Sequence, residues 1–331
     1  MLLFRSNPSS FRATLWIVSA ATFGAFLCWG LPAALAQTSA ELPKPLVIDG
    51  HRHVGDGGFL GDKFRAADVI EEMDQHGIDK AVILPMGDMP ASGEQDSRRL
   101  AGKERANDDY FNRGIVSDLI KKLQSDRVDH TEIVAAIRLY PTRLIGVYMI
   151  NPWIGEPELQ AAEYAIAEQG FRGMKLHPMN NAFHADNDVV DPVLKLARKL
   201  NVPVMFHTSF GLDTEPARVA KVAARFPDVN IIMYHPGIGE FYKGAIQAAQ
   251  GQANVYLDTA HVKPAALQAF LDQVPPEQII YGCDAPWGQW ASKFDLVREA
   301  TRLNPEVQQL VMGENMARLL SLPALTEAAS K

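Results

Sequence analysis

Two histidines separated by a single residue follow an apolar run in the stretch LVIDGHRHVG (46–55). Side chains two positions apart on a strand point to the same side, so His51 and His53 would present their imidazoles together. Two imidazole nitrogens on one rigid edge form a chelating pair for a divalent transition metal. The same spacing also suits hydrogen-bonded surface or core histidines, so the pair alone does not establish a metal site.

Further side chains with metal or proton chemistry follow later apolar runs. They are Lys175 and His177, His207, His235, Asp258 and Asp284. If these runs are neighbouring strands, His207 and Asp284 would complete a site of nitrogen and oxygen ligands with an open position for water. We assign no chemistry to the histidines in helix-like segments or loops, which are His76, His130, His184 and His261.

Short apolar runs rich in Val and Ile alternate with longer amphipathic stretches. Eight runs have the length and composition of strands: 46–50, 81–84, 144–149, 172–176, 203–206, 230–234, 254–257 and 279–282. Between them lie helix patterns such as AADVIEEMDQHG and EPARVAKVAARFP, apolar on one face. This alternation predicts parallel strands joined by crossover helices. Eight units favour an α/β fold of the (β/α)8 TIM-barrel type, although an open doubly wound sheet would alternate in the same way.

The first 36 residues have the features of an export signal rather than of a domain. Two arginines and no acidic residue precede a long apolar stretch, and small residues stand at Ala34 and Ala36. Cleavage after Ala36 would leave a single domain of residues 37–331 in the periplasm or outside the cell. An uncleaved membrane anchor over residues 14–36 is the alternative.

The charge of the chain bears on its partners. The net charge is −7, and loss of the two arginines in the signal would change it to −9. No run of Lys or Arg remains, which argues against nucleic acid and against stable association with an anionic membrane. Cys283 would be the only cysteine left, so no intrachain disulfide can form. We expect a small-molecule substrate as partner and leave a homo-oligomer open.

Seven short motifs are spread over residues 46–322. They are IDGHRH (48–53), YPTRLIGV (140–147), GFRGMKLHP (170–178), VMFHTS (204–209), YHPG (234–237), GCDAPWG (282–288) and GENMARLL (313–320). With these motifs the chain resembles the amidohydrolase superfamily, particularly the branch of aminocarboxymuconate-semialdehyde decarboxylase and many metal-dependent hydrolases. The resemblance implies that the metal ligands are His51, His53, His207 and Asp284. It also implies that His235 polarises the substrate or moves a proton.

The residues themselves suggest the same mechanism. A bound Zn²⁺ lowers the pKa of its water towards about 7, and Asp284 could accept the proton that this water releases. His235 would hold a carbonyl oxygen or protonate a leaving group, which suits an imidazole of near-neutral pKa. A structural histidine at the end of a strand is the alternative for His235.

Lys175 makes the number of metal ions ambiguous. Binuclear members of the superfamily place a carboxylated lysine at this position to bridge two ions. An uncarboxylated Lys175 could instead bind a substrate carboxylate or pair with Asp258 inside the barrel. We favour one ion, most simply Zn²⁺, with Lys175 and His177 contacting the substrate. Trp287, and with it Trp290, either walls the pocket or packs beneath a loop.

Two loops are expected to shape specificity. Glycines after the first strand, in GDGGFLGD (55–62), permit tight turns, and phosphate binding there is a weak alternative because no Walker-type lysine follows. A long stretch without apolar period begins at Pro85 and has the character of a lid. Its arginines, Arg98, Arg99 and Arg105, could bind an acidic substrate, but a solvated charged loop explains them more simply.

Three functions fit these residues. The first is a metal-dependent hydrolase of a small ester, lactone or amide. The second is a non-oxidative decarboxylase of an aromatic or unsaturated acid that uses the same site, because one fold supports several reactions. The third is a metal-binding or solute-binding protein without turnover, and the presence of both His235 and Asp284 argues against it.

Overall fold

The computed structural model describes residues 45–56, 63–86, 121–208, 214–288 and 290–322. Contacts divide the chain into Met1–Pro43 and Lys44–Lys331, and all described residues belong to the second unit. The predicted export signal and the three arginines of the predicted lid lie outside the described residues. No helix within them is long and apolar enough to cross a membrane.

The strands form one sheet in the order β2-β1-β3-β4-β5-β6-β7-β8-β9. Its strands are β1 (Ile48–Asp56), β2 (Lys63–Phe64), β3 (Lys80–Pro85), β4 (Leu144–Met149), β5 (Phe171–Leu176), β6 (Val204–His207), β7 (Ile231–Tyr234), β8 (Val255–Asp258) and β9 (Ile279–Ile280). Only β2 pairs antiparallel, as a short flap on β1. The other neighbours pair parallel, as crossover helices require.

The sheet closes on itself between β9 and β1. The amide of Gly50 donates to the carbonyl of Tyr281 (2.9 Å), and the amide of His53 donates to that of Ala285 (2.9 Å). Arg52 and Ala285 also form a parallel bridge. These bonds make a closed barrel, so the (β/α)8 prediction is confirmed and the open sheet is excluded.

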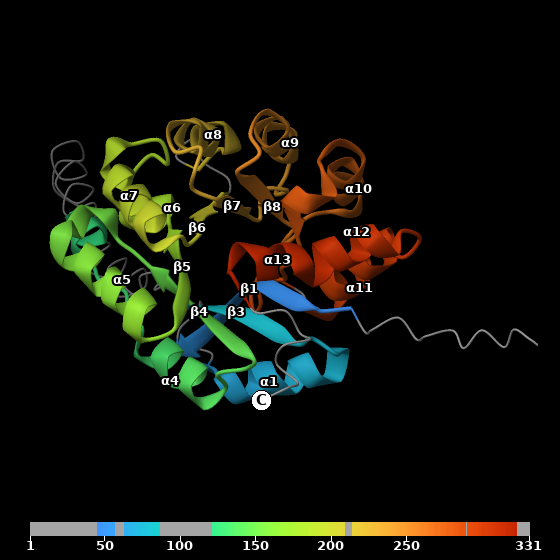
Figure 1. Ribbon diagram of the computed structural model, residues 1–331, viewed down its shortest axis with the longest axis horizontal. Coiled ribbons are helices and arrows are strands. Elements are labelled where there is room, and N and C mark those ends of the chain that lie inside the picture. The colour runs from blue at the N-terminus through green and yellow to red at the C-terminus, as the bar shows by residue number, and fades with distance from the viewer. Residues whose placement is uncertain (1–44, 57–62, 87–120, 209–213, 289, 323–331) are drawn as a thin grey trace, which may run out of the picture. The chain divides into compact units, whose positions relative to one another are not determined.

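Helices surround the barrel on its outside, except that the last one, α13 (Asn315–Leu319), lies across one end of it (Figure 1). The others are α1 (Ala66–His76), α4 (Thr131–Leu139), α5 (Glu156–Glu168), α6 (Pro178–Asn181), α7 (Asp191–Leu200), α8 (Pro216–Arg225), α9 (Tyr242–Gly251), α10 (Pro264–Gln273), α11 (Trp290–Thr301) and α12 (Pro305–Gln309). Short turns of 3₁₀ helix are η1 (Pro152–Ile154), η2 (Asp188–Val190) and η3 (Pro276–Gln278), and η4 (Leu310–Glu314) is a π-helical turn.

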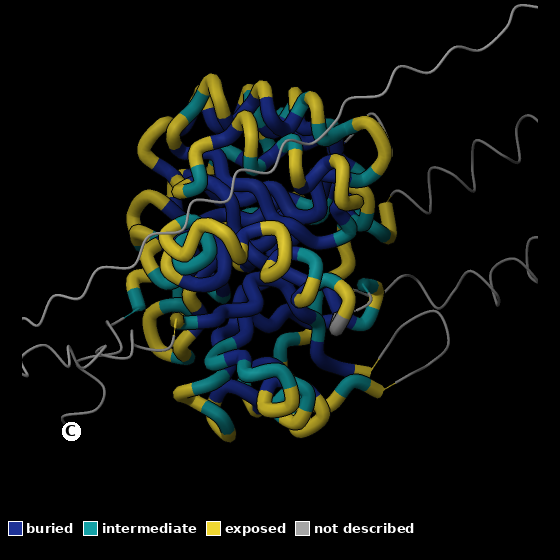
Figure 2. The backbone as a smooth tube through the Cα atoms, turned by 90° about the vertical axis from the view of Figure 1, so that its right-hand side faces the viewer, coloured by how far each residue is buried: buried dark blue, intermediate teal, exposed yellow. Residues whose placement is uncertain are grey.

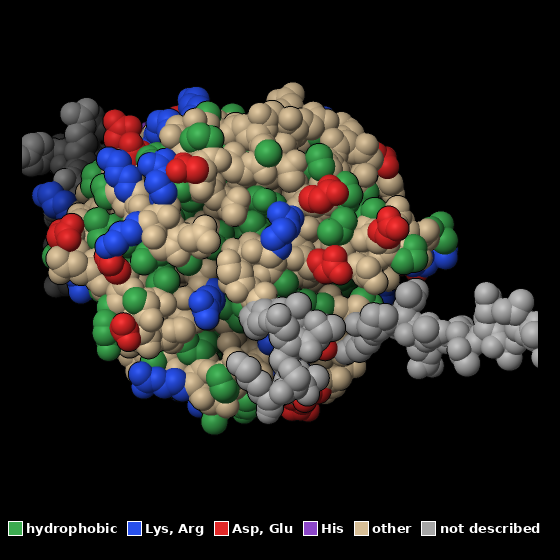
Figure 3. Space-filling view, in the orientation of Figure 1, with side chains coloured by type: hydrophobic (Ala, Val, Ile, Leu, Met, Phe, Trp, Pro, Cys, Tyr) green, Lys and Arg blue, Asp and Glu red, His purple; other side chains and the backbone are tan. Residues whose placement is uncertain are grey.

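Buried apolar side chains form two clusters. The buried segments of the backbone lie in the interior of the molecule (Figure 2). One cluster lies between the strands and the surrounding helices. The other cluster joins inward-facing strand residues such as Val82, Met205 and Ile232 to Met316 and Leu319 of α13. The second cluster therefore fills the barrel interior from the side of α13. On the face in Figure 3, Lys and Arg side chains lie among Asp and Glu.

The predicted strands coincide closely with the observed ones. β4 has the predicted bounds, and most others differ by a residue at one or both ends. The main difference is β1, which continues to Asp56 rather than ending at 50. The longer strand places His51 and His53 inside the sheet instead of just after it.

Candidate metal and active site

The first and last strands of the barrel bring His51, His53 and Asp284 together. Both histidines lie on β1, and Asp284 lies four residues after β9. The amide of Asp284 donates to the carbonyl of His51 (2.7 Å). This bond at the closure of the barrel places the carboxylate beside the two imidazoles.

The three side chains have the geometry of a metal site. One carboxylate oxygen, Asp284 Oδ1, lies 3.1 Å from His51 Nε2 and 3.2 Å from His53 Nε2. The three candidate ligand atoms all lie within 4.8 Å of one another. The two imidazole nitrogens thus converge on a single carboxylate oxygen.

Hydrogen bonds on the far side of each ring fix which nitrogen carries the proton. His51 Nδ1 donates to Asp258 Oδ2 (2.9 Å), and His53 Nδ1 donates to the carbonyl of Pro85 (2.7 Å). Since both partners can only accept, a neutral ring leaves Nε2 with a lone pair. Burial lowers the pKa of His51 well below its ordinary value, which keeps that ring neutral.

Two lone pairs therefore face a carboxylate oxygen, an arrangement that a cation between them stabilises. Burial raises the pKa of Asp284, but the neighbouring imidazoles of His51, His261 and His53 outweigh burial and hold it well below its ordinary value. The carboxylate is consequently ionised. Two imidazoles and a carboxylate are the ligands of a divalent transition metal, so the residues fit such an ion.

Asp258, at the end of β8, supports this group from behind. Its Oδ2 accepts the Nδ1 hydrogen of His51 and the backbone amide of His235 (3.2 Å). Burial raises the pKa of Asp258 to about 6. Gly282 makes room for it, because a Cβ there would lie 2.2 Å from Asp258 Oδ1 and 2.9 Å from His51 Cβ.

His235 follows β7 and faces the second oxygen of Asp284. Its Nδ1 contacts the carbonyl of Thr208 in a very short hydrogen bond, and its Nε2 lies 3.9 Å from Asp284 Oδ2. Burial lowers the pKa of His235 to about 3, so the neutral ring offers an unprotonated Nε2 at neutral pH. The predicted catalytic histidine is therefore placed to receive a proton held by Asp284.

His261 is a site residue that the sequence reasoning missed. Its Nε2 lies 3.0 Å from Asp284 Oδ2, and its side chain is 29% exposed. The residue stands in a loop, three positions after Asp258, where no strand pattern of the sequence places it at the site. Its proximity to a strand-end aspartate was the one available signal.

Three of these residues have unusual backbone geometry. His235, His261 and Asp284 adopt positive φ angles of 44°, 54° and 55°. Residues with a Cβ pay a steric cost in this region, and such conformations concentrate at functional sites. The turns after β7, β8 and β9 thus hold these side chains in positions that ordinary turns would not give.

His207 and His177 stack on each other beside the metal group. Their ring centroids are 3.8 Å apart with an angle of 19°. His207 is not one of the three clustered ligands, although its buried Nε2 has no hydrogen-bond partner among the described residues. The structure brings together three of the four predicted ligands and leaves His207 nearby on the same cavity.

Lys175, at the end of β5, is buried and only 1% exposed. Its Nζ lies 4.0 Å from the ring centroid of Tyr234, and that ring stacks on His51 with centroids 3.6 Å apart. Burial lowers the pKa of Lys175 to about 7. Within the described residues, Lys175 and Asp258 form no ion pair.

The predicted site residues line one cavity of about 270 Å³. Its polar lining consists of Lys175, Asp284, Asn180 and the histidines 51, 53, 177, 207, 235 and 261. Trp287 lines it too, together with Met149, Met179 and Ile238, and is 42% exposed. The side chain of Trp290 lies outside the described residues.

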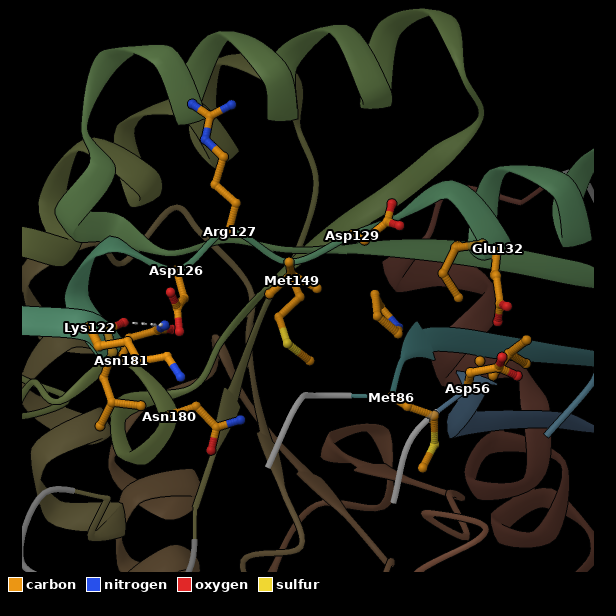
Figure 4. A pocket seen from close by; sticks show the side chains of 16 residues that line it. Asp56, Met86, Lys122, Asp126, Arg127, Asp129, Glu132, Met149, Asn180 and Asn181 are labelled. Carbon is orange, nitrogen blue, oxygen red and sulfur yellow. Dashed lines mark hydrogen bonds between the residues drawn. The ribbon is translucent and has the colours of Figure 1, made fainter. Parts of the chain in front are cut away.

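A second cavity of about 640 Å³ adjoins the first. Both are lined by Met149 and Asn180, and the second also by acidic side chains that include Asp126 and Glu132 (Figure 4). Arg127 comes from the same segment as Asp126 and forms an ion pair with the buried Glu158 (3.2 Å).

Asp49 does not join the metal group, although it precedes His51 by two residues. It accepts the Sγ hydrogen of Cys283 (2.9 Å) and the amides of Cys283 and His51. Burial raises the pKa of Asp49 to about 6. Asp49 therefore ties β1 to the segment that carries Asp284.

The amidohydrolase family profile matches residues 48–322, a span that includes the whole metal group. The chain belongs to the amidohydrolase family. It is an enzyme of that family, and its clustered His51, His53 and Asp284 support a divalent-metal site. A comparison with curated proteins gave no match.

Solved structures share the fold of this amidohydrolase. One is 2,6-dihydroxybenzoate decarboxylase from Rhizobium, at 14% identity over 84% of this chain and 99% of that chain, with a TM-score of 0.59. Another is 5-carboxyvanillate decarboxylase from Novosphingobium aromaticivorans with manganese and a nitrobenzoic acid, at 14% identity, 84% and 96% coverage and a TM-score of 0.57. A third is a probable 2-pyrone-4,6-dicarboxylic acid hydrolase from Acinetobacter baumannii with citric acid bound, at 15% identity, 83% and 99% coverage and a TM-score of 0.57.

Proposed function

We propose that this amidohydrolase hydrolyses an ester, lactone or amide of a small molecule. The observation that carries the proposal is that the two carboxylate oxygens of Asp284 face different groups. Its Oδ1 faces His51 and His53, while its Oδ2 contacts His261 and faces His235. One carboxylate can thus serve the metal group with one oxygen and move protons with the other.

Zn²⁺ is the ion we propose, because two imidazoles and a carboxylate are ligands that it prefers. His207 is the further ligand we propose, since its buried Nε2 has no other partner among the described residues. When bound, the ion supplies polarisation of a carbonyl oxygen and a water of lowered pKa.

The side chains of Asp284 and His235 then transfer the proton that the attacking water releases. Asp284 Oδ2 accepts it from the attacking water. It can pass to Nε2 of His235, which carries no hydrogen because Nδ1 donates to Thr208. Burial lowers the pKa of His235, so its protonated ring is a stronger acid than an ordinary imidazolium and gives the proton to the leaving oxygen or nitrogen.

A non-oxidative decarboxylase of an aromatic or unsaturated acid is the second candidate. Two of the three compared structures are named as decarboxylases of aromatic acids. The cavity wall formed by Met149, Ile238 and Trp287 suits such a skeleton. In that reaction the carbon–carbon bond breaks, CO2 leaves, and the protonated His235 supplies the hydrogen that replaces it.

A substrate panel distinguishes the two reactions. Metal-loaded protein would be incubated with lactones, esters, amides and carboxylic acids, and acid release and CO2 release would be followed in parallel. We expect acid release without CO2, abolished by chelation and restored by Zn²⁺. Asp284→Asn should lower the rate at least about 100-fold.

Asp272→Asn is the matched control, because Asp272 is an exposed acid on α10. It should retain wild-type rates. Release of CO2 in place of acid would support the second candidate, and full activity of Asp284→Asn would remove Asp284 from the mechanism.

We also propose that the enzyme works in the periplasm or outside the cell as residues 37–331. The support is the charge and apolar pattern of the first 36 residues. Amino-terminal sequencing of protein from an exporting host tests this, with Gln37 expected first. A chain that still begins at Met1 in the membrane fraction would indicate the anchor.

A further inference from the structure

Lys175 and His177 form a pair of donors on the side of the cavity formed by β5. They stand two residues apart, Lys175 at the last position but one of β5 and His177 just after the strand, and both line the cavity. Neither belongs to the cluster of His51, His53 and Asp284. Their chemistry is therefore available to something other than the metal group.

The ammonium group of Lys175 lacks a carboxylate partner among the described residues. Its Nζ lies over the face of the Tyr234 ring, 4.0 Å from the ring centroid. A buried charge is costly unless an opposite charge or hydrogen bonds compensate it. A ligand that brings an anionic oxygen into the cavity would supply the missing compensation.

His177 differs from the histidines of the metal group in which ring nitrogen carries the hydrogen. Its Nδ1 accepts the backbone amide of Asn180 (3.2 Å), at the start of α6. A neutral ring must then carry its hydrogen on Nε2. His177 is consequently a hydrogen-bond donor, whereas His51, His53 and His235 present bare Nε2 atoms to Asp284.

The charges in the cavity also favour an anion. Asp284 is the one acidic side chain that lines it among the described residues. Lys175 and a divalent ion together bring more positive charge than that carboxylate and the buried Asp258 offset. The remaining wall, formed by Met149, Ile238 and Trp287, suits an apolar skeleton.

From these contacts we infer that Lys175 and His177 bind a carboxylate of the substrate, so that the enzyme acts on small acids with an apolar skeleton. Two donors match the two oxygens of a carboxylate. The inference rests on the proposed function only in taking this cavity as the substrate site. It also specifies that Lys175 acts as a free ammonium group.

The test measures binding rather than turnover. Isothermal titration of the full chain, both Zn²⁺-loaded and chelator-treated, would use isophthalate and its neutral match isophthalamide. Isophthalate should bind at least about tenfold more tightly, because hydrogen bonds to charged groups are stronger than those to neutral groups. Lys175→Met should remove most of this preference with or without metal, whereas Lys175→Arg should retain much of it.

His177→Asn isolates the second donor. An Asn side chain can still accept the amide of Asn180 but offers no donor in the place of Nε2. It should weaken isophthalate binding by less than Lys175→Met does. Lys199→Met is the control, because Lys199 is an exposed lysine paired with Glu163 (2.6 Å), and it should bind as the wild type does.

Several results would overturn the assignment. One is equal isophthalate affinity in wild type and Lys175→Met, and another is no isophthalate binding at all. Tighter, Lys175-dependent binding of inorganic phosphate would exclude carboxylate specificity. Two ions per wild-type chain with one lost in Lys175→Met would identify a carboxylated, bridging lysine. A chain that binds isophthalate but hydrolyses nothing would contradict the proposed function alone.

Discussion

At the scale of single residues, hydrogen bonds behind the imidazole rings decide which histidines can bind a metal. His51 and His53 give their Nδ1 hydrogens to acceptors and keep Nε2 free, whereas His177 does the reverse. A histidine in the wrong tautomer cannot coordinate without losing a hydrogen bond. The partners of the rings therefore matter as much as the rings.

Replacing Asp258 by Asn tests this dependence. An amide can turn its NH2 towards His51, so that the hydrogen of the ring shifts to Nε2 and blocks the ligand atom. We expect the affinity for Zn²⁺ or Mn²⁺ to fall by about 10- to 100-fold. Competition with a chromophoric chelator measures it.

The control for that experiment is again Asp272→Asn, which changes the same charge on the surface. It should leave the metal affinity unchanged. Unaltered affinity in Asp258→Asn would mean that the hydrogen bond to His51 does not select the tautomer.

The sequence predicted residues better where strands place them than where loops do. His51, His53 and Asp284 could be predicted because side chains alternate in direction along a strand and because the active sites of such barrels lie at the ends of the strands. His261 was missed because its position depends on a left-handed turn after β8. Asp49 bonds to Cys283 instead of joining the metal group. The register of β1 is irregular between Asp49 and Arg52, and no spacing rule reveals this irregularity.

At the scale of elements, the site depends on how closely β1, β8 and β9 approach. Gly282 lies where Asp258 and His51 meet, and there is no room for another atom. The sequence predicted the strands themselves, since buried parallel strands appear as apolar runs. It could not predict this approach, because contacts between strands far apart in the chain arise only when the barrel closes.

Gly282→Ala should disturb both the site and the fold. Its Cβ would lie 2.2 Å from Asp258 Oδ1, so the carboxylate must move away from His51. Overpacking of this kind costs about 1–3 kcal/mol, and the metal affinity should fall with it. Chemical denaturation and metal titration measure the two effects.

Gly251→Ala is a matched control at the end of α9, where a Cβ would meet nothing within 4 Å. It should change neither metal affinity nor stability by an amount comparable to Gly282→Ala. Equal behaviour of the two variants would show that the space beside Asp258 is not limiting.

His130 links the segment before α4 to β4 and should make the fold sensitive to acid. Its Nε2 accepts the amide of Met149 (2.9 Å), its ring stacks on Tyr148, and burial lowers its pKa to about 4. The unfolded chain, with a pKa of about 6.5, binds the proton first as the pH falls. Stability should therefore drop between about pH 6.5 and 4, by up to about 3 kcal/mol from this residue.

Urea unfolding of wild type and His130→Gln at pH 7.5 and 4.5 measures that contribution. The loss of stability on acidification should be smaller in the variant, because Gln does not titrate. Other buried histidines keep part of the loss. An identical loss in both proteins would show that folding does not lower the pKa of His130.

At the scale of the whole molecule, the metal group joins the first strand of the barrel to the segment that follows the last strand. His51 and His53 come from the first strand, and Asp284 follows the last one. A bound ion would therefore cross-link the closure of the barrel, in addition to the backbone bonds between Gly50, Tyr281 and Ala285. Binding to the folded chain alone adds stability that grows with free metal, about 4 kcal/mol at about 1,000 times Kd.

Metal removal should consequently loosen the barrel locally as well as lower its melting temperature. Hydrogen exchange should accelerate on chelation at residues 48–54 and 281–286, and change little in α8, which follows β6 and precedes β7 in the chain. Restored Zn²⁺ should reverse both effects, with a melting temperature that rises with its concentration. Exchange that accelerates equally in α8 would mean that the ion stabilises the whole fold and not the contact between β1 and β9 in particular. The position of the ligands on the first strand and after the last strand would then have no local effect on stability.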